Sequence, residues 1–211
     1  MINRTEYRRR RGPPGKIQLN PLFFYHMNLD ICNKISEKIL LEGKYSDNEK
    51  YTNLFEKDKD VYAMGFVFTK DGVSDLLSEH AYLKPFVDET IDADMFNAFY
   101  LNALVVKNGN SVEKHLDTTL SHYVGHLTTA KKVSVLYLKV PDDMVGGQLN
   151  IYDGNNRNRI RPETGKLISF SGENPHSVSS TFTDYERISL VLESYYLEND
   201  SYSKIPKFKQ E

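Results

Sequence analysis

The sequence predicts a mainly β domain that is buttressed by helices. After Phe96, several short segments are rich in aromatic and β-branched residues and are separated by clusters of Gly, Pro, Asn and Asp. Before these segments, apolar residues recur at helical spacing. Short strands at regular intervals, preceded by helices, favour a sandwich or a barrel with helical buttressing.

One amphipathic helix is expected over about 29–42. Apolar side chains recur there at the spacing of one helical face, at Ile31, Ile35 and Ile39. Gly43 can end this helix. A second short helix is expected over 73–83, because Pro85 should stop it. The polar stretch 44–60 is expected to be an exposed loop.

The predicted strands follow these helices. The first of them covers 96–107 (FNAFYLNALVVK) and ends at the turn signal Asn108-Gly109-Asn110. Further strands are predicted over 111–116, 133–140, 148–152, 166–170 and 187–197. No internal repeat or change of composition indicates a second domain. The expected layout is a basic arm over 1–20, a single domain over 21–197 and a polar tail over 198–211.

The composition excludes several classes of protein. With 211 residues, 39% of them apolar, the chain can bury a core, so disorder is not its main description. No apolar run approaches the roughly 20 residues that cross a bilayer. No apolar stretch follows Arg8 to Arg11 as it would in a secretory signal, and the single Cys32 cannot form an internal disulfide. A cytoplasmic protein without membrane association is expected.

The net charge of -2 hides an asymmetry. Residues 1–16 hold six basic side chains against Glu6, which gives +5 and leaves -7 for the remaining residues. Such an arm could contact a polyanion or a membrane surface. A solvated chain end is the simpler interpretation.

Three residues have the chemistry of a metal centre. His115 and Asp117 share one face of a predicted strand end, about 7 Å apart along the strand. His176 follows a later strand and could add a third ligand. Two histidines and one carboxylate are typical of non-haem Fe(II) oxygenases. The HxD triplet alone is weak, since a strand-end histidine with a capping aspartate would look the same.

A charged residue in an apolar strand strengthens this interpretation. Arg187 and Ser189 share one face of the segment RISLVL. An arginine that points into a core needs an anionic partner, because an unpaired buried charge is costly. Its planar fork suits a carboxylate, and a nearby hydroxyl can add a donor.

With these motifs in order, the sequence resembles the Fe(II)/2-oxoglutarate-dependent oxygenase superfamily, in its prolyl-4-hydroxylase-like branch. The resemblance covers about 98–197, and it is the joint occurrence of the motifs that makes it specific. The matching segments are His115-Leu116-Asp117, Val135-Leu136-Tyr137-Leu138, Gly146-Gly147-Gln148-Leu149, 165–171 (GKLISFS), Pro175-His176-Ser177-Val178 and Arg187-Ile188-Ser189-Leu190.

The resemblance implies a double-stranded β-helix, a jelly-roll or cupin-like core, with N-terminal helices packed on its major sheet. It also implies Fe(II), 2-oxoglutarate and O2, with ascorbate as a reductant. The implied iron ligands are His115, Asp117 and His176. The implied 2-oxoglutarate contacts are Arg187, Ser189, Tyr137 and Val178. Tyr137 could equally be a core tyrosine with a satisfied hydroxyl.

Two differences from other members of this superfamily indicate which reaction is favoured. Halogenating members replace the acidic ligand by a small residue, so Asp117 favours hydroxylation. Alkylation-repair members carry a second arginine six residues after the first, where this chain has Glu193. Nucleic acid is therefore a less favoured substrate.

The segment after Asp117 could form the rim of the substrate entrance. The candidates for substrate contact there are Thr118, Thr119, His122 and Tyr123; a solvated loop is the alternative. His122 and His126 have the i, i+4 spacing of zinc ligands, but the sequence offers no evident third ligand. His26 and His80 are expected at the surface or at a helix edge.

Three functions remain open from the sequence. The first is hydroxylation of an unactivated C–H bond in a small molecule, an amino acid or a biosynthetic intermediate, with release of succinate and CO2. The second is a protein or peptide prolyl 4-hydroxylase on the same fold. The third is a non-catalytic cupin-like or nucleic-acid-binding module that uses the basic arm.

Overall fold

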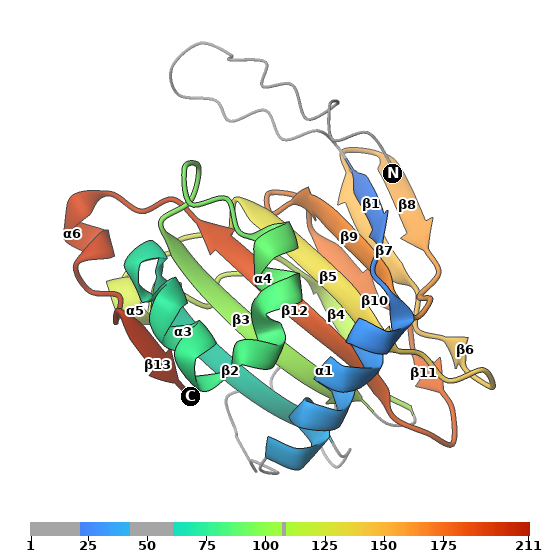
Figure 1. Cartoon of the computed structure of the whole chain (residues 1–211). Coiled ribbons are helices and arrows are strands. Elements are labelled where there is room, and N and C mark those ends of the chain that lie inside the picture. Colours follow the sequence, from blue (N-terminus) through green and yellow to red (C-terminus); the bar gives the residue numbers. More distant parts are fainter. Residues whose placement is uncertain (1–21, 43–60, 107–108) are drawn as a thin grey trace.

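Two antiparallel sheets form the centre of the computed structural model, which describes residues 22–42, 61–106 and 109–211 (Figure 1). The larger sheet has the strand order β1-β9-β5-β12-β3-β2-β13. Its strands are β1 (Phe23–His26), β9 (Lys166–Ser171), β5 (Lys132–Lys139), β12 (Arg187–Tyr195), β3 (Ala98–Val106), β2 (Val61–Thr69) and β13 (Phe208–Gln210).

The smaller sheet has the order β4-β10-β7-β8. Its strands are β4 (Val112–His115), β10 (His176–Val178), β7 (Leu149–Asp153) and β8 (Asn156–Ile160). A short ladder joins β6 (Val145–Gly146) to β11 (Thr181–Phe182). Buried side chains of the two sheets belong to one apolar cluster, with Tyr137 and Ile168 from the larger sheet and Ile151 from the smaller. This is the predicted double-stranded β-helix, and the predicted fold class is confirmed.

Helices cover the outer face of the larger sheet (Figure 1). They are α1 (Leu29–Glu42), α3 (Val73–Glu79) and α4 (Lys84–Thr90), with 3-10 turns η1 (Lys70–Gly72) and η2 (Ala81–Leu83) between β2 and α4. Two shorter helices are α5 (Ser121–Val124) and α6 (Asn199–Tyr202). Ile35 and Ile39 of α1 are fully buried against this face, as their spacing predicted.

Strand β12 runs through the middle of the larger sheet and faces both layers. Ile188, Leu190 and Leu192 pack in the cluster beneath the helices. The alternate residues therefore face the interior between the two sheets. This alternation places Arg187, Ser189 and Glu193 inside the barrel.

Several expectations need correction. Pro85 does not stop a helix but lies in the first turn of α4, where a proline is tolerated because its missing N–H has no helical acceptor. The segment 198–211, expected to be a polar tail, holds α6 and β13, and β13 pairs with β2. His80, expected at the surface or at a helix edge, does lie at the end of α3, but it is only 7% exposed and lies among Phe66, Tyr82 and Phe208.

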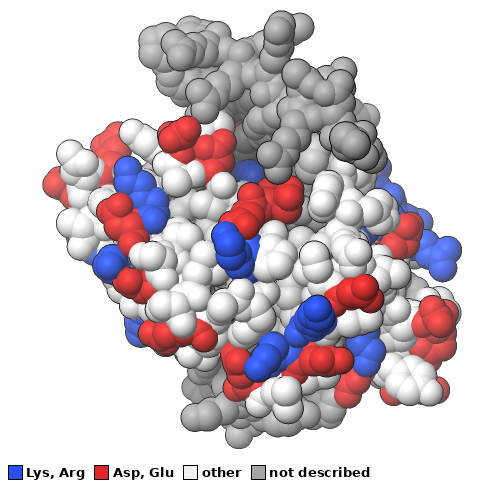
Figure 2. Space-filling model, in the orientation of Figure 1, with Lys and Arg blue, Asp and Glu red and all other residues white. Residues whose placement is uncertain are grey.

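The expected arm over 1–20 and the expected loop over 44–60 lie outside the described residues. Figure 2 shows acidic and basic side chains interspersed over the face that the helices cover. Among the described residues, none of the helices has the length and the apolar character needed to span a bilayer.

Candidate metal centre

The three candidate ligands come together at the edge where β4 and β10 meet. His115 ends β4 and is the direct ladder partner of His176, which begins β10. Asp117 follows His115 by two residues, outside the strand. The ligand atoms that these three residues offer all lie within 4.8 Å of one another. Strand pairing therefore brings together residues that are 61 positions apart in the sequence.

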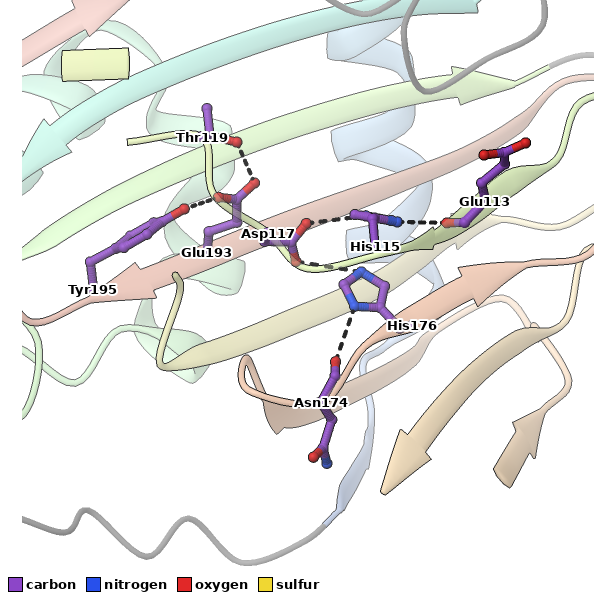
Figure 3. A network of polar contacts seen from close by, with 8 residues as sticks. All are labelled: Glu113, His115, Asp117, Thr119, Asn174, His176, Glu193 and Tyr195. Atoms are coloured by element: carbon purple, nitrogen blue, oxygen red, sulfur yellow. Dashed lines mark hydrogen bonds and ion pairs between the residues drawn. The ribbon is translucent and has the colours of Figure 1, made fainter. Parts of the chain in front are cut away.

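The carboxylate of Asp117 lies between the two imidazoles (Figure 3). Nε2 of His115 is 3.4 Å from Oδ1, and Nε2 of His176 is 3.4 Å from Oδ2. The other ring nitrogens face backbone carbonyls, with Nδ1 of His115 2.8 Å from the oxygen of Glu113 and Nδ1 of His176 3.5 Å from that of Asn174. A proton on each Nδ1 leaves both Nε2 lone pairs directed at the centre.

The environment of the histidines suits metal ligation. Burial lowers the pKa of His176, and although the charge of Asp117 opposes this, the net shift is downward. The same desolvation acts on His115, but the hydrogen bonds to Asp117 and to Glu113 outweigh it and raise its pKa. Oδ2 of Asp117 is buried without a hydrogen bond. A cation would satisfy this oxygen and bind both imidazoles in their neutral form.

The donor set indicates which cation fits. Two imidazoles and one carboxylate on one side of an ion leave other coordination positions open for small oxygen ligands. The described residues bring no fourth histidine, cysteine or carboxylate into the cluster. Zinc at His122 and His126 receives no support, because both side chains are exposed and no third ligand joins them in the described part of the chain.

Arg187 places a buried positive charge in the interior between the two sheets. Arg187 begins β12 and is 4% exposed, and burial lowers its pKa. One terminal nitrogen donates to the carbonyl of Gly147 at 3.4 Å, and Nε has no partner. No carboxylate pairs with Arg187 among the described residues. Such a site favours an anionic ligand with an acceptor for the free donors.

The surroundings of Arg187 supply two further polar groups. The ring of Tyr137 lies with its centroid 6.0 Å from the guanidinium carbon, and burial raises the pKa of its hydroxyl, so the phenol stays protonated and can donate. The hydroxyl of Thr181 is fully buried and has no partner. Thr181 is a ladder partner of Gly146, which brings it to this pocket.

Gly147 lets the backbone approach Arg187 and Thr181 closely. Its φ is +67°, a conformation that glycine adopts without strain. A Cβ at this position would lie 3.1 Å from the Thr181 hydroxyl and 3.2 Å from a terminal nitrogen of Arg187. Hydroxyl and guanidinium thus converge on one small space. Sequence analysis missed Thr181, because its only signal was a hydroxyl in the segment between two motifs.

Ser189 and Val178 also belong to this interior. Ser189 is 2% exposed and pairs with Tyr137 across β12 and β5. Val178 is half-buried against the interior cluster, next to Leu149 in the ladder. All four residues expected around 2-oxoglutarate therefore lie in strands that bound the same space.

The expected rim residues take different positions. The hydroxyl of Thr119 points inward and donates to Glu193 at 2.8 Å. The hydroxyl of Tyr123 donates to Glu211 at 2.5 Å, so it joins the C-terminal segment. His122 is exposed on α5, and Thr118 is half-buried with its carbonyl accepting from Ser121. Contact of these four residues with a substrate remains a prediction.

Comparison with known proteins agrees with the geometry. The family model described as the 2OG-Fe(II) oxygenase superfamily matches residues 100–192. This range contains all three candidate metal ligands and Arg187. No curated protein sequence matches the chain significantly.

Three solved structures share the fold. A prolyl-4-hydroxylase from Pseudomonas putida is 16% identical, with 84% of this chain and 93% of that one covered and a TM-score of 0.53. A prolyl hydroxylase from Trichoplax adhaerens, in complex with a hypoxia inducible factor peptide fragment, is 14% identical, with 87% and 86% covered and a TM-score of 0.58. A viral collagen prolyl hydroxylase from Paramecium Bursaria Chlorella virus-1, in its 2OG complex, is 13% identical, with 84% and 97% covered and a TM-score of 0.51.

Enzymes of this superfamily are dioxygenases that use Fe(II), 2-oxoglutarate and O2, and the cluster of His115, Asp117 and His176 could hold the iron. Residues 100–192 are thus similar to the 2OG-Fe(II) oxygenase superfamily, and the chain shares the fold of solved prolyl hydroxylases.

Proposed function

We propose that the chain hydroxylates an unactivated C–H bond, with Fe(II) held by His115, Asp117 and His176 and with 2-oxoglutarate anchored by Arg187. One observation carries this proposal. A cluster with the donor set of an Fe(II) site and a buried arginine without an anionic partner face the same interior. The cluster could bind Fe(II), and the arginine could bind the distal carboxylate of 2-oxoglutarate.

The residues have separate tasks in this proposal. Nε2 of each histidine and a carboxylate oxygen of Asp117 bind the metal, while the Nδ1 contacts to backbone carbonyls keep the rings in orientation. When bound, Fe(II) and 2-oxoglutarate would supply the oxidation: 2-oxoglutarate would be converted to succinate and CO2, with one atom of O2 entering succinate and the other entering the substrate. Ascorbate would serve as an external reductant.

The far end of the 2-oxoglutarate molecule defines the second task. Arg187 would pair with its distal carboxylate, and the hydroxyls of Tyr137, Ser189 and Thr181 would complete the hydrogen bonds. Val178 would pack against the methylene groups. The apolar strands around this pocket exclude water, which strengthens each of these contacts.

The test combines binding with turnover. Purified protein should bind 2-oxoglutarate in the presence of Fe(II) without O2, and should release succinate when a substrate is supplied. Asp117→Ala should abolish Fe(II) binding and substrate-dependent succinate release. Asp88→Ala, at an exposed position of α4 on the helix-covered outer face of the larger sheet, is the control and should leave both unchanged. Succinate release that survives in Asp117→Ala would refute the proposal.

A small molecule, an amino acid or a biosynthetic intermediate, is the first substrate candidate. A peptidyl proline is the second, because the chain shares its fold with prolyl hydroxylases, one of them solved with a peptide fragment. A metabolite panel and a proline-containing peptide array, both read by substrate-dependent succinate release and by mass gain of one oxygen, separate the two. Activity on free metabolites alone would support the first candidate, and activity on peptides alone would support the second.

A further inference from the structure

Glu193 links the central strand β12 to the segment that follows Asp117 (Figure 3). The hydroxyl of Thr119 donates to Oε1 of Glu193 at 2.8 Å, and the hydroxyl of Tyr195 donates to Oε2. Glu193 is 5% exposed and Tyr195 is fully buried. Both oxygens of this carboxyl group therefore have partners within the protein. One partner, Thr119, lies two residues after the candidate metal ligand Asp117.

A carboxyl group at this position is costly for folding. Burial raises its pKa to about 8, and the nearby charge of Asp117 acts in the same direction. Its neighbours on the inner face of β12 and β5 include Val191 and Val133, so an apolar side chain would suit the position better for stability alone. The presence of a carboxyl group at this position therefore indicates a role other than packing.

The segment that Glu193 contacts follows Asp117 and packs against the larger sheet further on, where Leu120 and Val124 are buried in the same cluster as Tyr195. Strand β4 ends at His115, so Asp117 lies outside the ladder that fixes the two histidines. Its carbonyl accepts a hydrogen bond from the backbone of Ala130 at 2.9 Å, within the same loop. Thr119, two residues after Asp117, is joined to the larger sheet by its hydroxyl, which donates to Glu193, and its backbone also hydrogen-bonds this carboxyl group.

We propose that Glu193 is a positioning residue for the metal centre: oriented by Tyr195, it holds Thr119 and thereby fixes the Asp117 carboxylate relative to the two imidazoles. This inference rests on the proposed function of the three ligands. Hydrogen-bonded partners behind a metal ligand typically contribute about 10- to 100-fold to metal affinity or activity. Glu193 would act in this way through the backbone between Thr119 and Asp117.

The test measures the metal site itself before turnover. Mn(II) affinity is measured by titration calorimetry, and the visible charge-transfer absorption of the anaerobic Fe(II) and 2-oxoglutarate complex reports the ligand geometry. Thr119→Val removes the hydroxyl with little change in shape. We expect it to weaken Mn(II) binding about tenfold and to shift the absorption band. Thr119→Ser, which keeps the hydroxyl, should restore both.

Two further variants complete the experiment. Glu193→Gln retains an acceptor for Thr119 and should fall between wild type and Glu193→Ala. Thr129→Val is the matched control, because Thr129 lies in the same loop without contact to Glu193, and it should behave as wild type. Wild-type Mn(II) affinity and an unshifted band in both Thr119→Val and Glu193→Ala would overturn the inference. Failure of Asp117→Ala to lose the metal would instead overturn the proposed function.

Discussion

The guanidinium carbon of Arg187 lies 6.0 Å from the ring centroid of Tyr137, and Nε of the same arginine has no partner. Replacing Arg187 by Met should remove the charge while filling a similar volume. The dissociation constant for 2-oxoglutarate should rise about 10- to 100-fold, since hydrogen bonds to a charged group are worth about 1.5–3 kcal/mol. Calorimetry with Mn(II)-loaded, oxygen-free protein measures this change.

Arg187→Met should stabilise the ligand-free protein, although it weakens 2-oxoglutarate binding. An unpaired buried charge destabilises the fold, so Arg187→Met should raise the free energy of unfolding by about 1–2 kcal/mol in the absence of 2-oxoglutarate. Arg159→Met, at an exposed position of β8, is the control and should change neither quantity. Weaker binding together with lower stability would instead indicate that Arg187 is a structural residue.

The Thr181 hydroxyl should contribute to the same pocket. Thr181→Val preserves the shape of this fully buried side chain and removes only the hydrogen-bonding group. Loss of one hydrogen bond to a carboxylate, about 1.5 kcal/mol, should weaken 2-oxoglutarate binding about tenfold without changing Mn(II) affinity. Thr181→Ser should bind as wild type. Equal affinities in the Val and Ser variants would exclude the hydroxyl from the pocket.

The elements that the sequence predicted well are those whose pattern is local. Helix α1 occupies Leu29–Glu42, as the helical spacing of its apolar residues predicted. The strands that carry Tyr137 and Arg187 could be placed because their apolar runs are bounded by turn residues. His115, Asp117 and His176 could be grouped through the joint pattern of motifs, and the ladder between β4 and β10 brings them together.

The elements that sequence analysis missed depend on partners far along the chain. Strand β8 reads Asn-Arg-Asn-Arg-Ile, with no apolar alternation, and exists through its pairing with β7. Strand β13 pairs with β2 across about 140 residues. In the sequence, Glu193 stood out only because alkylation-repair members carry an arginine at this place. Its contact with Thr119, 74 residues away, could not be predicted. No local pattern carries such contacts.

Docking of the C-terminal segment should depend on Gly72. A Cβ at this glycine would lie 1.6 Å from the carbonyl oxygen of Lys207, so any larger residue must displace the chain before β13. Gly72→Ala should lower the free energy of unfolding by about 1–3 kcal/mol and should increase hydrogen exchange at Phe208–Gln210. Ser74→Ala, exposed on α3, is the control. Unchanged exchange in Gly72→Ala would contradict the close approach.

The buried carboxyl group of Glu193 should make stability depend on pH. Its pKa in the folded protein is about 8 against an ordinary value of 4.5, so the folded state binds more protons than the unfolded state between these values. The free energy of unfolding contributed by this group is therefore fully present below about 4.5 and is lost as pH rises toward about 8. Glu193→Gln does not titrate and removes this dependence.

The measurement is denaturant unfolding of the metal-free protein with a chelator, from pH 5 to about pH 9. Glu193→Gln should gain stability relative to wild type as pH rises, with most of the gain complete near the folded-state pKa of about 8. Asp117, whose charge raises the pKa of Glu193, remains in both proteins, so the difference isolates the Glu193 carboxyl group. Glu186→Gln, at a half-exposed carboxylate paired with Lys139, is the control and should run parallel to wild type. Parallel curves for Glu193→Gln and wild type would mean that Glu193 is ionised in the folded protein, and its contact with Thr119 would then be that of a carboxylate throughout the working range of pH.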